Sequence, residues 1–337
     1  MTAYYRPIPR TDHARPAGAL TLAGGWTWFD TVEVLYRDAP SRLLPASELP
    51  QHALERLTAP RAPIAGLGFE APQLMGILNV TPDSFSDGGQ HFDPAVATSH
   101  AATMQAQGAS MIDVGGESTR PGAEEVAIDE EVRRTAPVIK AIREASPVPI
   151  SIDTRKAPVA QAAHEAGADL VNDVAGFTFD PALAPFAAKA GLPVCVMHAQ
   201  GTPDIMQADP RYDNVALDIY DYLESRITAL EATGIPRARI VTDPGIGFGK
   251  TLEHNLTLLQ NLALFHSLGC PVLLGASRKR FIGTLGGTEE ARHRAPGSIA
   301  VALAGVAQGV QMLRVHDVRE TAEALRLWQA ATLGQVS

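Results

Sequence analysis

The stretch PISIDTRKAPVAQAAHEAGADLVND, residues 149–173, decides the fold. It contains a short strand, Pro149–Asp153, an alanine-rich helix that ends at Gly167, and a second strand, Leu170–Asp173. A glycine suits the left-handed backbone position that commonly ends a helix. Strands that alternate with helices in this way are typical of a parallel sheet covered on both faces. The stretch therefore predicts a β-α-β unit.

The same unit recurs along the chain from Leu74 onward. In each repeat a predicted helix gives way to a short aliphatic run, often just after a glycine, and polar residues return where the run ends. Eight such strands predict a closed (β/α)₈ TIM barrel, a fold that takes roughly 250 residues. An open doubly wound sheet is the alternative, but it does not explain why nearly every strand ends in polar residues. The predicted strands are Leu74–Val80, Met111–Val114, Pro149–Asp153, Leu170–Asp173, Val194–His198, Ile240–Asp243, Val272–Gly275 and Met312–His316.

Residues 1–72 differ from the rest and show no recognisable chemistry. Two runs near Trp26–Phe29 and Thr31–Tyr36 predict short strands. Ala46–Leu57 predicts a helix with Ser47 or a neighbouring residue as its cap. We expect an N-terminal extension over residues 1–72, a barrel over residues 73–332 and a tail over residues 333–337.

Composition excludes several classes of protein. The net charge of −9 argues against a broad nucleic-acid-binding surface. Two cysteines, Cys195 and Cys270, are too few for a disulfide framework, and both lie in apolar runs, so we expect them to be packing residues. The N-terminus lacks the apolar core of a signal peptide, and no apolar run approaches the roughly 20 residues that span a bilayer. We expect a soluble, cytoplasmic protein with no membrane partner.

The polar residues at the strand ends are the candidate functional residues, because these ends meet at one face of a barrel. Arg314 and His316 lie two residues apart on the last strand, so their side chains point the same way and suit a phosphate-like anion. The stretches in chain order are Asn79–Gly89, Gly115–Gly122, Asp153–Thr154, Asn172–Asp173, Met197–Gly201, Asp243–Lys250, Gly275–Phe281 and Arg314–Asp317.

Taken together and in this order, these stretches closely resemble those of dihydropteroate synthases. The resemblance runs from Gln73 to Gln329 and leaves residues 1–72 outside it. It implies displacement of pyrophosphate from 6-hydroxymethyl-7,8-dihydropterin pyrophosphate by p-aminobenzoate, in folate biosynthesis. It also implies a homodimer and a magnesium ion, Mg²⁺, that bridges the pyrophosphate oxygens and is held in part by Asn79.

The resemblance assigns a role to each group of residues. Asn172, Asp243 and Lys279 bind the pterin ring, Asp153 lies near its reacting side, and Arg314 with His316 holds the pyrophosphate. This agrees with the chemistry of a pterin, whose amide and amidine-like edge needs carboxylates, an amide and a cation. The predicted catalytic residues are Asp153, Lys279, Arg314 and His316. The predicted substrate-binding residues are Phe85, Thr119, Arg120, Pro121, Asp153, Asn172, Met197, Asp243, Phe248, Gly275, Ser277, Lys279, Arg314 and His316, of which Phe85 and Thr119–Pro121 lie on loops that close over p-aminobenzoate.

The stretch Pro244–Thr251 looks like a phosphate-binding P-loop but lacks its first glycine, because Pro244 stands in that position. We therefore reject the hypothesis that the chain is a nucleoside triphosphatase. We expect the glycines to let the backbone pass close beneath a flat ligand, with Phe248 beside it.

Two other functions remain as alternatives. A pterin-binding methyltransferase would use the same barrel, but it has no need for the loop Ser277–Lys279 or for the pair Arg314 and His316. A catalytically silent barrel that binds a partner is the other alternative. The roles of His198 and Arg280 stay open.

Overall fold

Eight parallel strands form the barrel that the sequence predicts. The structure is a computed structural model that describes residues 2–81, 94–118, 125–201 and 209–335. The strand order is β11-β10-β9-β8-β7-β6-β13-β12, and a bridge between Thr242 and Val272 joins the two ends of this series. The barrel strands are β6 (Gln73–Asn79), β7 (Met111–Gly115), β8 (Ile150–Asp153), β9 (Leu170–Asp173), β10 (Val194–Met197), β11 (Ile240–Asp243), β12 (Leu273–Leu274) and β13 (Met312–Val315).

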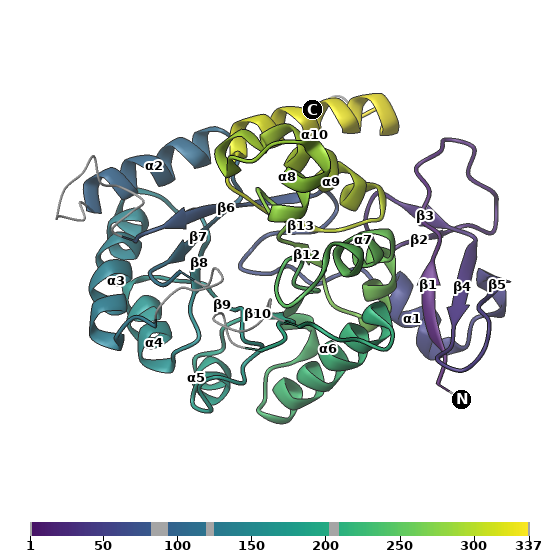
Figure 1. Cartoon of the computed structure of the whole chain (residues 1–337), viewed down its shortest axis with the longest axis horizontal. Helices are drawn as coiled ribbons and strands as arrows, with labels where there is room; N and C mark the ends of the chain where they lie inside the picture. Colours follow the sequence, from purple (N-terminus) through teal and green to yellow (C-terminus); the bar gives the residue numbers. More distant parts are fainter. Residues whose placement is uncertain (1, 82–93, 119–124, 202–208, 336–337) are drawn as a thin grey trace.

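Helices surround the barrel and alternate with its strands (Figure 1). Gly167 and Gly191 end two of them with φ values of 116° and 67°, which confirms the predicted left-handed position. Two helices, instead of one, lie between β12 and β13. The helices are α2 (Pro94–Ala106), α3 (Ile128–Ala145), α4 (Ala157–Ala166), α5 (Leu183–Ala190), α6 (Val215–Ala232), α7 (Leu252–Gln260), α8 (Arg280–Gly286), α9 (Ala295–Ala307) and α10 (Val318–Leu333).

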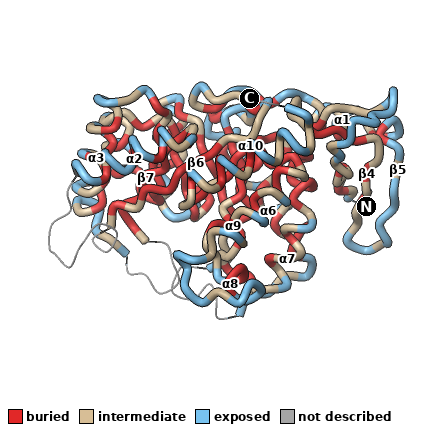
Figure 2. The backbone as a smooth tube through the Cα atoms, turned by 90° about the horizontal axis from the view of Figure 1, so that it is seen from above, coloured by how far each residue is buried: buried red, intermediate tan, exposed pale blue. Residues whose placement is uncertain are grey.

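The strands are buried along almost their whole length (Figure 2). At the amino ends of the strands, side chains from seven of them fill the barrel interior as one apolar cluster. Cys195 belongs to this cluster, and Cys270 is buried in the main core, so both cysteines are packing residues, as predicted. The seven strand residues of the interior cluster are Met75, Met111, Leu170, Cys195, Val241, Leu273 and Met312.

The N-terminal extension forms a small antiparallel sheet at one side of the barrel (Figure 1). Three strands pair in the order β1-β4-β5, and a two-stranded sheet, β2-β3, lies beside them. The elements are β1 (Tyr4–Pro7), β2 (Leu20–Thr21), β3 (Trp28–Phe29), β4 (Thr31–Leu35), β5 (Arg42–Pro45), the 3-10 helix η1 (Ala46–Glu48) and α1 (Gln51–Thr58).

The extension is bonded to the outside of the barrel. Trp26 Nε1 donates to the carbonyl of Val306 in α9 at 2.9 Å, and Tyr4 donates from its hydroxyl to Asp221 in α6 at 2.8 Å. Further along the chain, Ile64 and Phe69 join the apolar cluster inside the barrel. The extension therefore supplies part of the core that closes the amino end of the barrel.

Two details of the extension differ from the sequence prediction. The predicted helix Ala46–Leu57 is divided into η1 and α1, because Pro50 precedes the first turn of α1. The predicted cap by Ser47 or a neighbouring side chain is wrong: Pro45 and Pro50 occupy the N-caps of η1 and α1, and no side chain caps either one.

Candidate active site at the carboxyl ends of the barrel strands

Arg314 is at the centre of the polar residues at the carboxyl ends of the strands. Its Nε donates to Asp113 Oδ2 at 2.6 Å, and its Nη2 donates to Asp153 Oδ2 at 2.7 Å. These contacts join β13 to β7 and β8 across the barrel. Burial alone would lower the pKa of Arg314, but Asp113 and Asp153 raise it above its ordinary value. The guanidinium is therefore a fixed cation.

Asp153 has an unusual environment for a carboxylate. It is 8% exposed and shares the guanidinium of Arg314 with Asp113, which is fully buried. Burial raises the pKa of Asp153 to about 7, although Arg314 acts in the opposite direction. Two buried carboxylates with one cation leave an excess negative charge, which favours a proton on this carboxyl.

Sequence reasoning missed Asp113. It lies inside β7, in a run that otherwise reads as an ordinary buried strand, and its side chain faces the barrel interior beside Asn172 and Arg314. The Nδ2 of Asn172 lies 3.4 Å from both oxygens of Asp113, which is long for a hydrogen bond. A buried aspartate requires a partner, so its presence within an apolar strand was the signal available in the sequence.

Asp243 and Lys279 form the other side of the site. Asp243 is 5% exposed and accepts a hydrogen bond from the amide of Gly245 at 2.7 Å. Burial raises the pKa of Asp243, against the effects of the Gly245 amide, Lys279, Lys250 and Arg314. Lys279 Nζ lies 3.8 Å from the centroid of the Phe248 ring, a cation–π contact.

His316 is held by Ser277. The hydroxyl of Ser277 lies 3.0 Å from His316 Nδ1 and 3.2 Å from its amide nitrogen. This contact joins the end of β13 to the loop after β12, where Lys279 lies. The predicted residues Arg314, His316, Ser277 and Lys279 thus lie on adjoining elements.

Three of the remaining predicted residues lie in the described part of the chain, and four do not. Met197 is buried at the end of β10, in register with Asp243, and Gly275 has no side chain to separate it from Asp243 Oδ2. Asn79 is partly buried at the end of β6, in register with Gly115. Phe85, Thr119, Arg120 and Pro121 lie outside the described residues.

Comparisons with known proteins agree with this geometry. A family model described as "Pterin binding enzyme" matches residues 75–316. The dihydropteroate synthase of Escherichia coli K12 is 47% identical over 264 residues, which are 78% of this chain and 93% of that relative. The chain belongs to the dihydropteroate synthase family. It is an enzyme of the transferase class, and its activity is that of the family.

Solved structures of the family have the same fold. A Xanthomonas albilineans dihydropteroate synthase with 4-aminobenzoic acid has a TM-score of 0.76 and 44% identity, over 81% of this chain and 98% of that one. A structure of the enzyme from the same organism in complex with 7,8-dihydropteroate has a TM-score of 0.73 and 41% identity, over 81% and 98%. In the described part of this family member, no helix is long and apolar enough to cross a membrane.

Close backbone contacts explain the glycines in the loop after β11. A Cβ on Gly245 would lie 1.9 Å from the carbonyl oxygen of His198, and one on Gly249 would lie 2.7 Å from that of Gln200. Both glycines also have positive φ values, 70° and 61°. These two glycines therefore let the loop after β11 pass close to the loop after β10, and the flat ligand expected from the sequence stays a prediction.

A second set of buried charges adjoins this site. Glu117 pairs with Arg155 at 2.9 Å and with Lys156 at 3.1 Å, and Lys156 also pairs with Glu131 at 2.9 Å. Thr154, the neighbour of Asp153, donates from its hydroxyl to Glu131 at 2.7 Å. We call these four charged residues the Glu117 cluster. It fixes the chain just after β8. The cluster was not predicted from the sequence, because its acidic and basic members lie far from one another along the chain.

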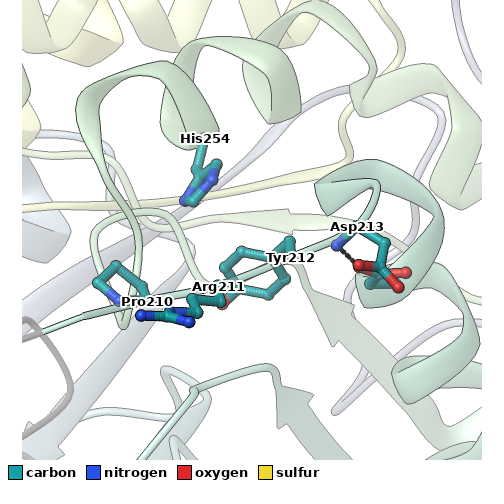
Figure 3. A pocket seen from close by; sticks show the side chains of 6 residues that line it. Pro210, Arg211, Tyr212, Asp213 and His254 are labelled. Carbon is teal, nitrogen blue, oxygen red and sulfur yellow. Dashed lines mark hydrogen bonds between the residues drawn. The ribbon is translucent and has the colours of Figure 1, made fainter.

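A pocket is lined by residues before and at the start of α6 and by His254 of α7, and none of its lining residues is a predicted substrate residue (Figure 3). Tyr212 lines it and donates to the carbonyl of Gly249 at 2.7 Å. The ring of Tyr212 also meets His254 edge to face, with centroids 4.9 Å apart. The pocket is therefore next to the glycine-rich loop, through Tyr212. Its lining residues are Pro210, Arg211, Tyr212, Asp213, Asp218 and His254.

Proposed function

We propose that this site condenses 6-hydroxymethyl-7,8-dihydropterin pyrophosphate with p-aminobenzoate, giving 7,8-dihydropteroate and pyrophosphate. The observation that carries the proposal is the convergence of an acidic, an amide and a cationic group at one end of the barrel. Asp243, Asn172 and Lys279 bind the pterin ring, in a pocket lined by Met197, Phe248 and Gly275. The burial of Asp243 and Asn172 supports this role, because buried polar groups need partners and a pterin edge supplies them.

The pyrophosphate binds Arg314, His316 and Ser277. An arginine presents a fork of N–H groups that matches phosphate oxygens, and His316 adds a further donor. The hydrogen bonds that Ser277 makes to His316 support the placement, since they fix the imidazole beside the anion. Asp153 lies near the pterin methylene, where positive charge develops.

The chain's own residues stabilise charge separation and require no strong base. The aniline nitrogen of p-aminobenzoate is neutral at pH 7, so it attacks the pterin methylene directly. The C–O bond to pyrophosphate breaks ahead of C–N bond formation, because the dihydropterin ring can carry the cation. The anilinium formed then loses its proton to water. Removing one preorganised group from such a site costs about 10² to 10³ in rate.

Magnesium is proposed as the cofactor, with Asn79 as its protein ligand. The amide oxygen of Asn79 is a hard donor at the end of β6, and magnesium commonly takes few protein ligands because it keeps its waters. Among the described residues no cluster of three or more histidine, cysteine or acidic side chains could hold a metal. When bound, magnesium would neutralise negative charge on the pyrophosphate oxygens.

The p-aminobenzoate site is proposed to include Phe85, Thr119, Arg120 and Pro121, on the loops after β6 and β7. Arg280, which is exposed at the start of α8, stays without an assigned role.

We also propose a cytoplasmic homodimer, organised as an extension over residues 1–72, a barrel over residues 73–332 and a tail over residues 333–337. The resemblance of the sequence to a family of dimers supports the assembly, and the start of β6 at Gln73 supports the first boundary. Light scattering after gel filtration would test the dimer, and a mass near the 35.7 kDa of one chain would contradict it.

The activity is tested by incubating the purified protein with the pterin pyrophosphate, p-aminobenzoate and magnesium. We expect dihydropteroate and pyrophosphate in equal amounts, and neither product when p-aminobenzoate is left out. Failure to form dihydropteroate under these conditions would contradict the proposed function.

A further inference from the structure

Lys250 is a buried lysine that the proposed reaction does not use. It is 4% exposed, at the end of the glycine-rich loop after β11. Its Nζ lies 3.0 Å from His198 Nδ1, 2.8 Å from the Phe248 carbonyl oxygen and 3.4 Å from the His198 carbonyl oxygen. An ammonium group has three N–H bonds, so each one has an acceptor.

These contacts are unusual because Lys250 forms no ion pair with a carboxylate in the described part of the chain, and burial lowers its pKa well below the ordinary value although Asp243 acts in the opposite direction. A buried cation without such a partner is costly. A neutral ring of His198 can either accept a hydrogen bond from the amine at Nδ1 or donate one to it from Nδ1–H, depending on the tautomer. Burial, and then the charge of Lys250, lowers the pKa of His198 to about 2, so the ring stays neutral. The burial of Lys250 therefore lowers the stability of the fold, which indicates that this lysine serves another purpose.

The geometry indicates what Lys250 does. It connects the loop after β10, through His198, to the loop after β11, through the carbonyl of Phe248. The ring of Phe248 in turn contacts the ammonium of Lys279. His198 is itself fixed, because its ring packs edge to face on Tyr222 with centroids 4.7 Å apart. Lys250 thus ties Phe248, and through it Lys279, to a rigid support.

We propose that Lys250 and His198 are positioning residues for the pterin pocket, which hold Phe248 against Lys279. The inference rests on the proposed assignment of Asp243, Phe248 and Lys279 to that pocket. It assigns His198 a structural role beside the pocket and no contact with the substrate. It also explains the lysine of the P-loop-like stretch without a nucleotide.

Three variants test the inference. Lys250→Met keeps the length of the side chain and removes all three donors. His198→Leu removes the acceptor, whereas His198→Asn places an amide oxygen near the position of Nδ1. Lys189→Met, at an exposed position of α5, is the matched control. Binding of pterin-6-carboxylate, a non-reactive pterin, is measured by calorimetry, and kcat and KM are measured for each substrate.

We expect Lys250→Met and His198→Leu to weaken pterin binding by about tenfold or more and to lower kcat/KM by up to roughly 10²-fold, since small misplacements of a site have effects of this size. The KM for p-aminobenzoate at saturating pterin pyrophosphate should stay near that of the wild type. His198→Asn and Lys189→Met should bind the pterin as the wild type does. General loss of stability would not produce this division between the two substrates, nor the recovery by asparagine.

Nitrogen-15 NMR of the histidines adds a readout that does not depend on activity. The resonance of His198 Nδ1 should differ between the wild type and Lys250→Met, because Lys250 Nζ contacts this atom. If Lys250→Met does not fold, the pair His198→Leu and His198→Asn decides the matter. Wild-type pterin affinity in Lys250→Met and His198→Leu, or an unchanged Nδ1 resonance in Lys250→Met, would overturn the inference. Wild-type pterin affinity in Lys279→Ala would instead overturn the pocket assignment on which it rests.

Discussion

Arg314 and Asp153 form a buried ion pair across the barrel, with Nη2 and Oδ2 2.7 Å apart. Because Asp113 uses the same guanidinium, the ion pair belongs to a group of three charges with one negative charge in excess. A substrate pyrophosphate must bind beside these carboxylates, and the developing pterin cation would compensate them. In the free enzyme, a full negative charge on Asp153 is therefore unfavourable.

The pH dependence of stability should show this excess charge. The pKa of Asp153, about 7, lies above that of an aspartate in an unfolded chain. Its stabilising contribution is therefore fully present below the unfolded pKa and is lost as the pH rises through about 7. Asp153→Asn lacks this titration. As the pH rises from 5 to 7, the free energy of unfolding of the wild type should therefore fall relative to that of Asp153→Asn, by about 1.4 kcal/mol per pH unit. Denaturant titrations at several pH values measure the difference, with the exposed Asp38→Asn as control. A constant difference would contradict the raised pKa.

Removing the pterin contacts should abolish binding without unfolding the barrel. Lys279→Ala and Asp243→Ala each remove a charged hydrogen-bonding group, which should weaken pterin binding by at least about tenfold. Calorimetry with pterin-6-carboxylate measures the loss, and circular dichroism checks the fold. Lys189→Ala is the control. Turnover like that of the wild type in either variant would exclude the pterin assignment.

Sulfonamides should inhibit by competing with p-aminobenzoate. The loop from Phe85 to Gly89 shows no insertion in the sequence that would separate the two ligands. Raising the p-aminobenzoate concentration should therefore restore the initial rate at a fixed sulfonamide concentration. Inhibition that added p-aminobenzoate does not relieve would place the drug elsewhere.

Substrate binding should be ordered, with the pterin pyrophosphate first. Asp153, Asn172 and Asp243 lie on buried strand ends and are preformed. The predicted p-aminobenzoate residues belong to long stretches of sequence that contain glycines and prolines, and fixing such stretches around a ligand costs conformational entropy that pyrophosphate and magnesium can offset. Calorimetric titration of p-aminobenzoate into the free enzyme should show weak or no binding. Pyrophosphate, magnesium and pterin-6-carboxylate together should tighten it markedly, and equal affinity in both cases would refute the order.

The Glu117 cluster should contribute strongly to stability when one member is removed. Lys156→Met leaves Glu131 buried without a cation, which should cost about 3 to 5 kcal/mol. Arg133→Met also removes an ion pair, but that arginine side chain is 65% exposed, so the loss of stability should be much smaller. Denaturant unfolding of both variants measures the contrast. Similar losses would mean that the cluster is better hydrated than the structure indicates.

The sequence predicted the barrel well because its strands are signalled locally, by short aliphatic runs between helices. It also predicted the strand-end residues, since a polar residue at the end of a buried strand is visible without any partner. Asp113 was missed because its meaning depends on Arg314, which lies on the last strand. The short edge strands β1 and β5 were missed as well, because β5 is largely exposed and has no core pattern.

The glycines after β11 show a different limit. Their positions were visible in the sequence, but the groups they approach, the carbonyls of His198 and Gln200, lie on another loop. Close packing between loops has no local signal. The flat ligand expected beneath this loop stays a prediction, and Phe248 does lie beside Lys279.

The position of Ile64 and Phe69 has a consequence for synthesis of the chain. These residues leave the ribosome before every barrel strand that buries them, and one of their partners, Met312, is on the last strand. Until that strand arrives, the amino end of the barrel exposes an apolar surface that neither half of the chain can cover alone. A truncated chain that stops before β13 would keep this apolar surface exposed, and chaperones that bind exposed apolar surface would bind it.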